Sequence, residues 1–238
     1  MRIDGRKPDE IRPVSIERNY TKFAHGSVLI AVGNTKVICT ASIEDSVPPH
    51  KKNTSEGWIT AEYSLLPGST PRRVPRESSR GKVGGRTHEI QRLIGRSMRA
   101  IADLSAIKER TIWIDCDVIQ ADGGTRVASI TGAYVALADA ISWLKNNVEI
   151  SGEPLTGSVA AVSVGIVDGI PLLDLCYEED VTADVDMNIV LTGGGEYIEL
   201  QGTAEKQTFS EEELAQMMGQ AKKGIRELTL IQKDVLRS

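Results

Sequence analysis

The fold is decided by the stretch TIWIDCDVIQADGGTRVASITGAYVALADAISWL, residues 111–144. Its first nine residues alternate between apolar side chains and the aspartates Asp115 and Asp117, which is the period of a half-buried strand. After the turn QADGGTR, apolar residues recur every three or four positions from Val127 to Leu144, which predicts an amphipathic helix. A strand that turns directly into such a helix predicts helices packed on a sheet.

Further strands and helices are expected on both sides of this stretch. Gly33-Asn34 separates two β-rich runs and predicts a hairpin, and apolar spacing from Thr87 onward predicts a helix. A last helix is expected from Ser210, where Glu213 completes a capping box. The expected strands are 27–32, 35–41, 57–66, 111–119, 158–167, 170–177, 183–192 and 196–203.

No stretch separates the two halves of the chain convincingly. The best candidate for a linker is ISGEPLTG, residues 150–157, and it is typical of a loop. The predicted fold class is therefore α+β, with two strand-rich halves and their helices packed into one domain that spans residues 1–238.

The composition is that of an ordinary globular protein, with 40% hydrophobic residues, 26% charged residues and a net charge of −5. This balance argues against a surface coated in basic charge, although one local basic patch suffices to bind nucleic acid. The cysteines and histidines are scattered, which argues against structural zinc and favours buried, reduced thiols at Cys39 and Cys116. Without an apolar leader or a run of 18 apolar residues, a soluble cytoplasmic protein with no membrane contact is expected.

The turn QADGGTR suits an anion. Glycines at a strand-to-helix turn let backbone N–H groups approach a ligand closely, and the following helix begins with unpaired donors and a partial positive charge. Thr125 adds a hydroxyl group and Arg126 a two-pronged cation. The alternative is a tight turn in which Thr125 only caps the helix and Arg126 is solvated. The pattern is neither a P-loop nor a GxGxxG motif, and the turn alone leaves both interpretations open.

Residues 67–86 are a second candidate site, a loop rich in Pro, Gly and Arg without periodicity. Its last part sets several cations against the single acid Glu77, in a chain of negative net charge. This local charge favours a polyanion, most simply a nucleic-acid backbone, and the alternative is a solvated flexible loop. Arg86 directly precedes a helix, so we expect it to point into a site. The cations are Arg72, Arg73, Arg76, Arg80, Lys82 and Arg86.

The acidic stretch CYEEDVTADVDMN, residues 176–188, is a third candidate. Asp184 and Asp186 would share one face of a strand, and Asp180 in the preceding turn would fold back toward them. Clustered carboxylates suit a hard cation such as Mg²⁺, and like charges raise the pKa of a carboxyl group, as a general acid requires. The alternative is an acidic turn on a solvated strand face. Together, the three segments indicate phosphate chemistry on nucleic acid.

Several stretches resemble the bacterial ribonuclease PH family, and the likeness runs over essentially the whole chain. They are GWITAEYSLLP, RGKVGGRTHEIQRLIGRSMRA, IDCDVIQADGGTRVASITGA, VAAVSVGI, and VDMN followed by ELQGTAE. The resemblance implies the RNase PH fold, of the ribosomal protein S5 domain 2-like class, and a homohexamer built as a trimer of dimers. It also implies a phosphorolytic 3′→5′ exoribonuclease, or tRNA nucleotidyltransferase, that trims precursor tRNA and other RNA 3′ ends. Inorganic phosphate would be the nucleophile, nucleoside diphosphate the product, and Mg²⁺ or another divalent cation the cofactor.

The resemblance also implies roles for single residues. Arg73 and Arg76 would contact RNA. Asp180 and Asp186 would serve metal binding and acid catalysis, with Asp184 as an additional candidate ligand. The residues that would hold phosphate are Arg86, Gly124, Thr125 and Arg126.

The chain departs from the family pattern at Gly68, where relatives usually carry an arginine that helps to grip RNA. Arg72, an extra basic residue four places on, would compensate as an RNA contact. Because the arginine at position 68 is absent, we expect weaker or altered tRNA binding with phosphorolysis retained. Val127 replaces a usual threonine and is expected to pack within its helix, and PPHKKNTSEGW departs from a glycine-rich family version.

Two other classes of function fit parts of the pattern. A non-catalytic ring subunit that binds RNA without cutting it typically lacks the phosphate arginines or the aspartates, whereas this chain keeps Arg86, Arg126 and both Asp180 and Asp186. An unrelated enzyme of a small phosphorylated metabolite would not remove 3′ nucleotides from a CCA-extended tRNA in a phosphate-dependent way.

Overall fold

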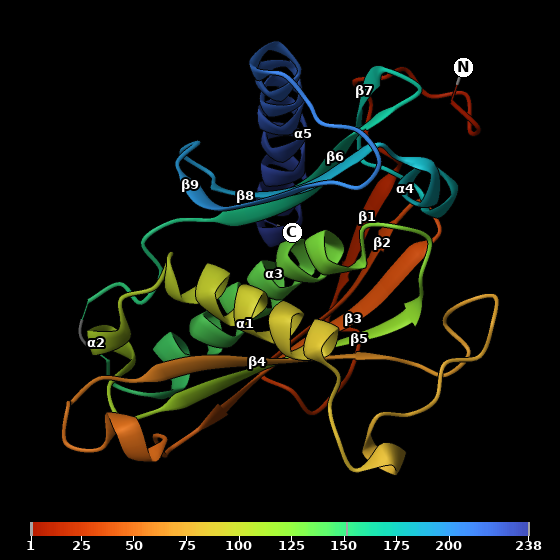
Figure 1. Ribbon diagram of the computed structural model, residues 1–238. Coiled ribbons are helices and arrows are strands. Elements are labelled where there is room, and N and C mark those ends of the chain that lie inside the picture. Colours follow the sequence, from red (N-terminus) through yellow and green to blue (C-terminus); the bar gives the residue numbers. More distant parts are fainter. Residues whose placement is uncertain (1, 151, 238) are drawn as a thin grey trace.

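The computed structural model describes residues 2–150 and 152–237, which form four stacked layers (Figure 1). A five-stranded sheet forms the first layer, and the helices α1 (Gly85–Arg99) and α3 (Thr125–Asn147) cover its inner face. A four-stranded sheet lies over these helices, and α5 (Glu211–Arg237) packs against its other side. The predicted α+β class with two strand-rich halves is confirmed.

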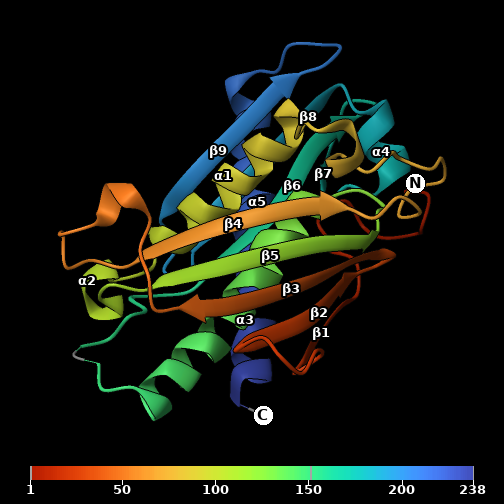
Figure 2. The same ribbon diagram turned by 90° about the horizontal axis from the view of Figure 1, so that it is seen from below.

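The first sheet has the strand order β1-β2-β3-β5-β4 and is seen face on in Figure 2. All neighbouring strands are antiparallel except β4 and β5, which run parallel because α1 and the short α2 (Leu104–Ile107) connect them. The strands are β1 (Val14–Arg18), β2 (Gly26–Val32), β3 (Thr35–Glu44), β4 (Trp58–Leu65) and β5 (Thr111–Gln120).

The predicted hairpin is confirmed, since β2 and β3 pair through the two residues Gly33-Asn34, and Gly33 has a φ of 55°. Strand β1 was not predicted. It lies at the sheet edge and exposes every second residue, including Glu17, so its sequence carries little apolar signal.

The second sheet is antiparallel, in the order β7-β6-β8-β9. Two predicted boundaries were wrong. Strand β7 ends at Leu173 because Asp174 adopts a left-handed backbone, and a short helix, α4 (Tyr177–Thr182), follows it. Strand β8 begins at Val185, so Asp184 precedes the strand and Asp180 lies on α4. The strands are β6 (Val159–Val167), β7 (Ile170–Leu173), β8 (Val185–Thr192) and β9 (Tyr197–Ala204).

Helix α3 forms the centre of the core. It packs on β2 and β3 with one side and on β6 with the other, so it is buried nearly all round rather than amphipathic as predicted. Among the described helices, it alone has the length and apolar composition to cross a membrane, but 78% of its most apolar window is buried in the fold. Its apolar surface is therefore explained by the two sheets. Val127 is buried in this core, as expected.

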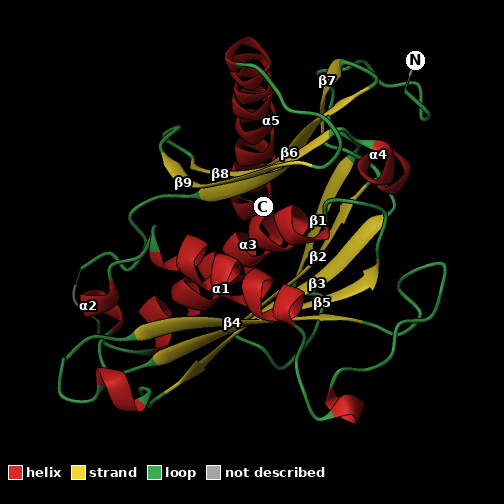
Figure 3. Ribbon diagram, viewed as in Figure 1, coloured by secondary structure: helices red, strands yellow, loops and turns green. Residues whose placement is uncertain are grey.

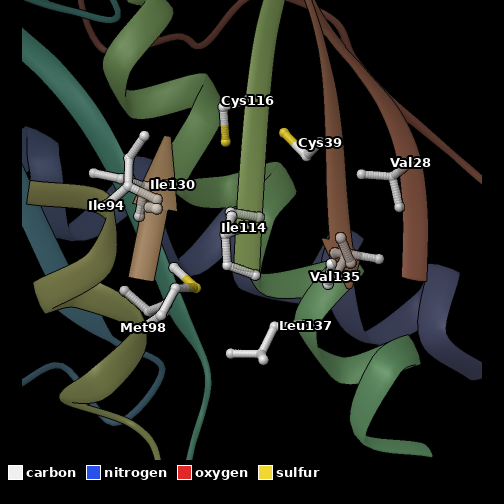
Figure 4. Close-up of a cluster of buried hydrophobic side chains, with 14 of the residues drawn as sticks. Val28, Cys39, Ile94, Met98, Ile114, Cys116, Ile130, Val135 and Leu137 are labelled. Atoms are coloured by element: carbon white, nitrogen blue, oxygen red, sulfur yellow. The ribbon is translucent and has the colours of Figure 1, made fainter. Parts of the chain in front are cut away.

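The two central cysteines lie inside this core (Figure 4). Cys39 on β3 and Cys116 on β5 are directly opposite in the sheet, buried and free. The prediction of buried, reduced thiols at these positions is confirmed. The capping box of α5 is also confirmed, since the Ser210 N–H donates to Glu213 Oε2 at 2.7 Å and the Glu213 N–H donates to Ser210 Oγ at 3.2 Å.

The segment between β4 and α1 is a long loop with one 3₁₀ turn at Ser78–Arg80 (Figure 3). Its single acid, Glu77, is not solvated freely. Glu77 Oε1 accepts hydrogen bonds from the Gly84 N–H at 3.2 Å and from Thr87 Oγ1 at 2.9 Å, so it fixes the start of α1. The side chain of Arg80, one of the predicted loop cations, lies outside the described part of the structure.

Candidate active site

A cavity of about 700 Å³ opens where the two halves of the chain meet. The loop after β4, the turn before α3, helix α4 and strand β8 each contribute to its lining. The structure therefore brings the three candidate segments together. The predicted residues that line the cavity are Arg72, Arg86, Gly124, Thr125, Arg126, Asp180 and Asp186.

Of the residues to which the resemblance gives a role in RNA contact, metal binding or catalysis, three lie outside this lining, and so does the loop cation Lys82. Arg73 and Arg76 are exposed on the loop, and Arg76 lies near Asp117, where it opposes the rise in the pKa of Asp117 that burial causes. Asp184 is engaged through its backbone, since its N–H donates to the Ile166 carbonyl at 2.8 Å and its carbonyl accepts from Glu205 at 2.8 Å.

The turn before α3 presents backbone donors to the cavity. Gly123 and Gly124 have φ values of 76° and 66°, and Gly124 is the residue that caps α3. Among the described residues, no acceptor binds the N–H groups of Gly123, Gly124, Thr125 and Arg126. These donors lie at the positive end of the helix dipole, so the turn is suited to an anion.

Gly123 is required for a reason that the sequence did not indicate. A Cβ atom at this position would lie 2.6 Å from the Cys176 carbonyl carbon and 2.7 Å from both the Leu175 oxygen and the Tyr177 nitrogen. The turn therefore packs directly on the backbone that leads into α4. At Gly124, in contrast, an added Cβ atom would meet no backbone atom and only side-chain atoms at 3.1 Å or more. Of the two glycines, Gly124 is therefore the one that fits the predicted role of close approach to a ligand.

The two cations of the site are held differently. Arg126 Nη1 donates to Glu89 Oε1 on α1 at 3.0 Å and to Gln201 Oε1 on β9 at 2.8 Å. Arg86, in the first turn of α1, is exposed and finds no hydrogen-bond acceptor within the described chain. Arg126 is thus fixed by its neighbours, whereas the Arg86 head group is available to a ligand. The sequence reasoning missed Glu89 and Gln201, although both lie inside the stretches that carry the family resemblance.

The two carboxylates face these cations. Burial raises the pKa of Asp186 to about 6, and the nearby charge of Asp180 adds to the rise. Burial also raises the pKa of Asp180, while Arg86 and Arg126 oppose the shift. Glu205, which directly follows β9, raises the pKa of both aspartates and was not predicted.

The acidic pair fits a hard cation. Over the described residues, no group of three or more His, Cys, Asp and Glu side chains could form a metal site, so a closed protein cage is not present there. Mg²⁺ is commonly bound by one or two carboxylates together with water and substrate phosphate, and Asp180 and Asp186 in one cavity match that need. The amide of Asn188, 3.5 Å from Asp186 Oδ2, adds a polar group to the same wall.

A cavity that sets two arginines and a helix N-terminus against two carboxylates is typical of an enzyme that transfers a phosphoryl group. Comparison with known families identifies the class. Residues 10–141 match domain 1 of the 3′ exoribonuclease family, RNase PH, and residues 157–224 match domain 2 of the same family. The chain belongs to the RNase PH family of 3′ exoribonucleases.

Individual relatives agree with this assignment. Ribonuclease PH of Corynebacterium kroppenstedtii is 60% identical over 236 residues, which cover 99% of this chain and 93% of that protein. Among solved structures, an Archaeoglobus fulgidus exosome with RNA bound to the active site matches with a TM-score of 0.82 and 24% identity, over 96% of this chain and 91% of that one. Rice (Oryza sativa) Rrp46 matches with a TM-score of 0.79 and 21% identity, over 99% of this chain and all of that one. At these identities the structures support the RNase PH fold alone.

Proposed function

We propose that this chain is a phosphate-dependent 3′→5′ exoribonuclease that trims the 3′ end of precursor tRNA and releases nucleoside 5′-diphosphates. Membership of the RNase PH family and the 60% identity to Ribonuclease PH support this activity. The observation that carries the proposal is the shared cavity, in which Arg86 and Arg126 face Asp180 and Asp186. A site that only bound phosphate would not need the carboxylates.

The cationic side of the cavity would hold inorganic phosphate, the co-substrate. Two anions repel each other, so phosphate and the RNA phosphodiester react only if cations and N–H donors bring them together. Arg86, Arg126 and the N–H groups of Gly124 and Thr125 supply these donors, and the buried Thr125 hydroxyl adds a further polar contact. Gln201 and Glu89 keep the Arg126 side chain in place.

The reaction then requires a proton. A phosphate oxygen forms a bond to the last phosphodiester phosphorus as the bond to the 3′ oxygen breaks, and that oxygen takes up the proton. Asp186 is well suited to donate it, because a pKa of about 6 keeps a fraction of the carboxyl groups protonated near neutral pH. Asp180 would hold Mg²⁺, and Asp186 would serve as a second ligand only after it has given up its proton; the ion would stabilise negative charge on the transferred phosphoryl group.

RNA would approach along the basic loop. Arg72 lines the cavity, whereas Arg73 and Arg76 are exposed farther out, so we propose Arg72 as the contact nearest the reacting phosphate. The other two would attract the RNA backbone electrostatically. Gly68, close in sequence to these arginines, is exposed, and a Cβ atom there would meet nothing within 4 Å, which leaves open space at the position where the family resemblance implies an arginine.

Assembly and location belong to the same proposal. Exposed apolar side chains such as Phe23, 92% exposed, and Leu230, 60% exposed, support self-association, and we propose a homohexamer built as a trimer of dimers. The free cysteines support a reducing compartment such as the cytoplasm. The packing of α3 on both sheets supports one domain over the chain. Mass measurement in solution tests the hexamer.

The decisive experiment is phosphorolysis of a CCA-extended tRNA. We expect loss of 3′ nucleotides and release of nucleoside diphosphates with phosphate, and neither in phosphate-free buffer. Arg126→Ala should abolish the release while gel-shift affinity for RNA persists. Near wild-type release by this variant would refute the assigned role of Arg126.

A further inference from the structure

Arg12 and Asp174 form a buried ion pair that joins the two halves of the chain. Arg12 lies in the part that matches domain 1 and Asp174 in the part that matches domain 2. Arg12 Nε donates to Asp174 Oδ2 at 2.9 Å, and Arg12 Nη2 donates to Asp174 Oδ1 at 2.6 Å. The Arg12 N–H also donates to Oδ2, at 2.8 Å. Arg12 and Asp174 are 4% and 3% exposed, so the carboxylate holds the guanidinium in one orientation.

The remaining donors of Arg12 reach the turn before α3. Nη1 donates to the Asp122 carbonyl at 2.5 Å, and Nη2 approaches the Gly123 carbonyl at 3.4 Å. From the other side, Thr35 Oγ1 donates to the same Gly123 carbonyl at 2.7 Å and accepts from the Asp122 N–H at 2.9 Å. Two consecutive carbonyl groups of the turn are therefore fixed by side chains outside the cavity lining.

Fixing these carbonyls also fixes the donors that face a ligand. In a planar trans peptide, the C=O and the following N–H point in opposite directions. A Gly123 carbonyl held by Arg12 and Thr35 therefore turns the Gly124 N–H away from them, and the Asp122 carbonyl does the same for the Gly123 N–H. Glycines with positive φ do not hold such an orientation by themselves, because they lack the restraint of a side chain.

Asp174 orders the acidic side of the cavity as well. Its φ of 55° is unusual for a residue with a side chain, and neighbouring groups hold it there: its N–H donates to the Ser163 carbonyl at 2.7 Å, and its carbonyl accepts from Arg2 Nη2 at 2.9 Å. The same Arg2 guanidinium binds Glu179 in α4, at 2.7 Å and 2.8 Å, one residue before Asp180. The phosphate turn and the helix that carries Asp180 thus share one buried anchor.

We infer that Arg12 and Asp174 are positioning residues for the phosphate nucleophile. Asp174 aligns Arg12, and Arg12 holds the Asp122 and Gly123 carbonyls so that the turn's N–H groups point to inorganic phosphate. This inference rests on the proposed function and adds residues that touch neither phosphate nor RNA.

The test separates phosphate affinity from folding. Arg12→Lys keeps the charge but not the several donors, and Asp174→Asn keeps the shape but not the charge. We expect each variant to raise KM for phosphate by about tenfold, with kcat at saturating phosphate within about threefold. Calorimetric titration of inorganic phosphate into the RNA-free, metal-free chain should show the same weakening in Kd. A purely structural role would instead lower kcat or the melting temperature and leave KM and Kd unchanged.

Arg18→Lys is the matched control. Arg18 also binds a buried carboxylate through two nitrogens, with Nη2 at 2.6 Å and Nε at 3.1 Å from Asp139 Oδ1, but neither residue lines the cavity. This variant should keep the wild-type KM. If neither Arg12→Lys nor Asp174→Asn folds, Thr35→Val is the deciding variant, because it removes the other side chain that holds the Gly123 carbonyl. We expect it to raise KM for phosphate by about threefold. If the wild-type enzyme is active and every folded variant keeps the wild-type KM and Kd for phosphate, the inference about Arg12 and Asp174 is overturned, whereas the proposed function stands. A wild-type chain that neither binds phosphate nor releases nucleoside diphosphates would overturn the proposed function.

Discussion

The Tyr63 hydroxyl lies 2.8 Å from Thr125 Oγ1, and both side chains are buried. Tyr63 comes from β4 in the first sheet, whereas Thr125 is the first residue of α3 and lines the cavity. The sheet therefore restrains the rotation of a hydroxyl group that lines the cavity, where we propose that phosphate binds. Sequence reasoning found Thr125 but not the tyrosine that orients it.

Removing this hydroxyl should weaken both phosphate binding and the fold. We expect Tyr63→Phe to cost about 1 kcal/mol of unfolding free energy and to raise KM for phosphate by about threefold to tenfold, because the Thr125 hydroxyl loses its partner. Tyr134→Phe is the control. Tyr134 is partly buried in the same helix, and no hydrogen bond of its hydroxyl joins it to another described residue. Equal KM values for the two variants would contradict the orienting role of Tyr63.

Asp186 should make the protein less stable as the pH rises. Its folded pKa of about 6 exceeds the ordinary value of 3.8, so between these values the folded state keeps a proton that the unfolded state has lost. Above about pH 6 both states are ionised, and the full unfavourable difference is present. Asp186→Asn should therefore stabilise the chain near pH 7 by an amount on the order of 2–3 kcal/mol, and by almost nothing below pH 3.8.

The same substitution should abolish phosphorolysis, so activity and stability move in opposite directions. Urea unfolding of both proteins from pH 3.5 to pH 8 checks the first part, and nucleoside diphosphate release checks the second. Asp184→Asn tests whether the effect depends on position, because Asp184 lies outside the cavity lining. A stability gain that did not change with pH would show that the pKa of Asp186 is not the cause.

An arginine at position 68 should strengthen RNA binding. Gly68 is exposed, its φ is ordinary and a Cβ atom there meets nothing within 4 Å, so Gly68→Arg fits without strain. The added charge lies close in sequence to Thr70 and Arg72 of the cavity lining. We expect higher tRNA affinity at low salt and a slope of log K against log salt that is steeper by about 1.

Gly157→Arg is the matched control, because Gly157 also has open space and an ordinary φ but lies away from the cavity lining. Gel-shift titrations at several salt concentrations compare the two variants with the wild type. An unchanged affinity and salt slope for Gly68→Arg would refute the view that Gly68 weakens RNA binding.

The parts of the fold that were predicted from sequence are those whose signal is local. The Gly33-Asn34 turn and the capping box of α5 each depend on residues within one short segment, and both were correct. The predicted end of β7 was wrong because Asp174 leaves the strand conformation and is held outside it by hydrogen bonds from Arg2 and Arg12 to its carbonyl and side chain. These arginines lie more than 160 positions away in the sequence. No pattern within residues 170–177 contains that information.

The site divides in the same way. Residues whose chemistry is visible in their own segment, such as Arg126 and Asp186, were predicted and line the cavity, whereas their partners were not predicted. Glu89 and Gln201 become neighbours of Arg126 only when α1 and β9 meet over α3. The N-terminal arginines were missed because exposed cations are the common case, and burial of Arg2 and Arg12 depends on acids from the other half of the chain.

A side chain at position 123 should disable the site through the protein's own backbone. In Gly123→Ala the new Cβ would lie 2.6–2.7 Å from backbone atoms of residues 175–177, and the φ of 76° adds strain of roughly 1–2 kcal/mol. To relieve these close contacts, the turn before α3 must move away from the segment that leads into α4. We therefore expect loss of phosphate binding by titration calorimetry, together with lower stability.

Gly169→Ala separates the effect of the close contacts from the effect of backbone strain, because Gly169 has a similar φ of 73° but no atom within 4 Å of its added Cβ. That variant should lose stability through strain alone and keep the wild-type Kd for phosphate. If both variants bound phosphate like the wild type, the contact between the turn and residues 175–177 would not govern the site.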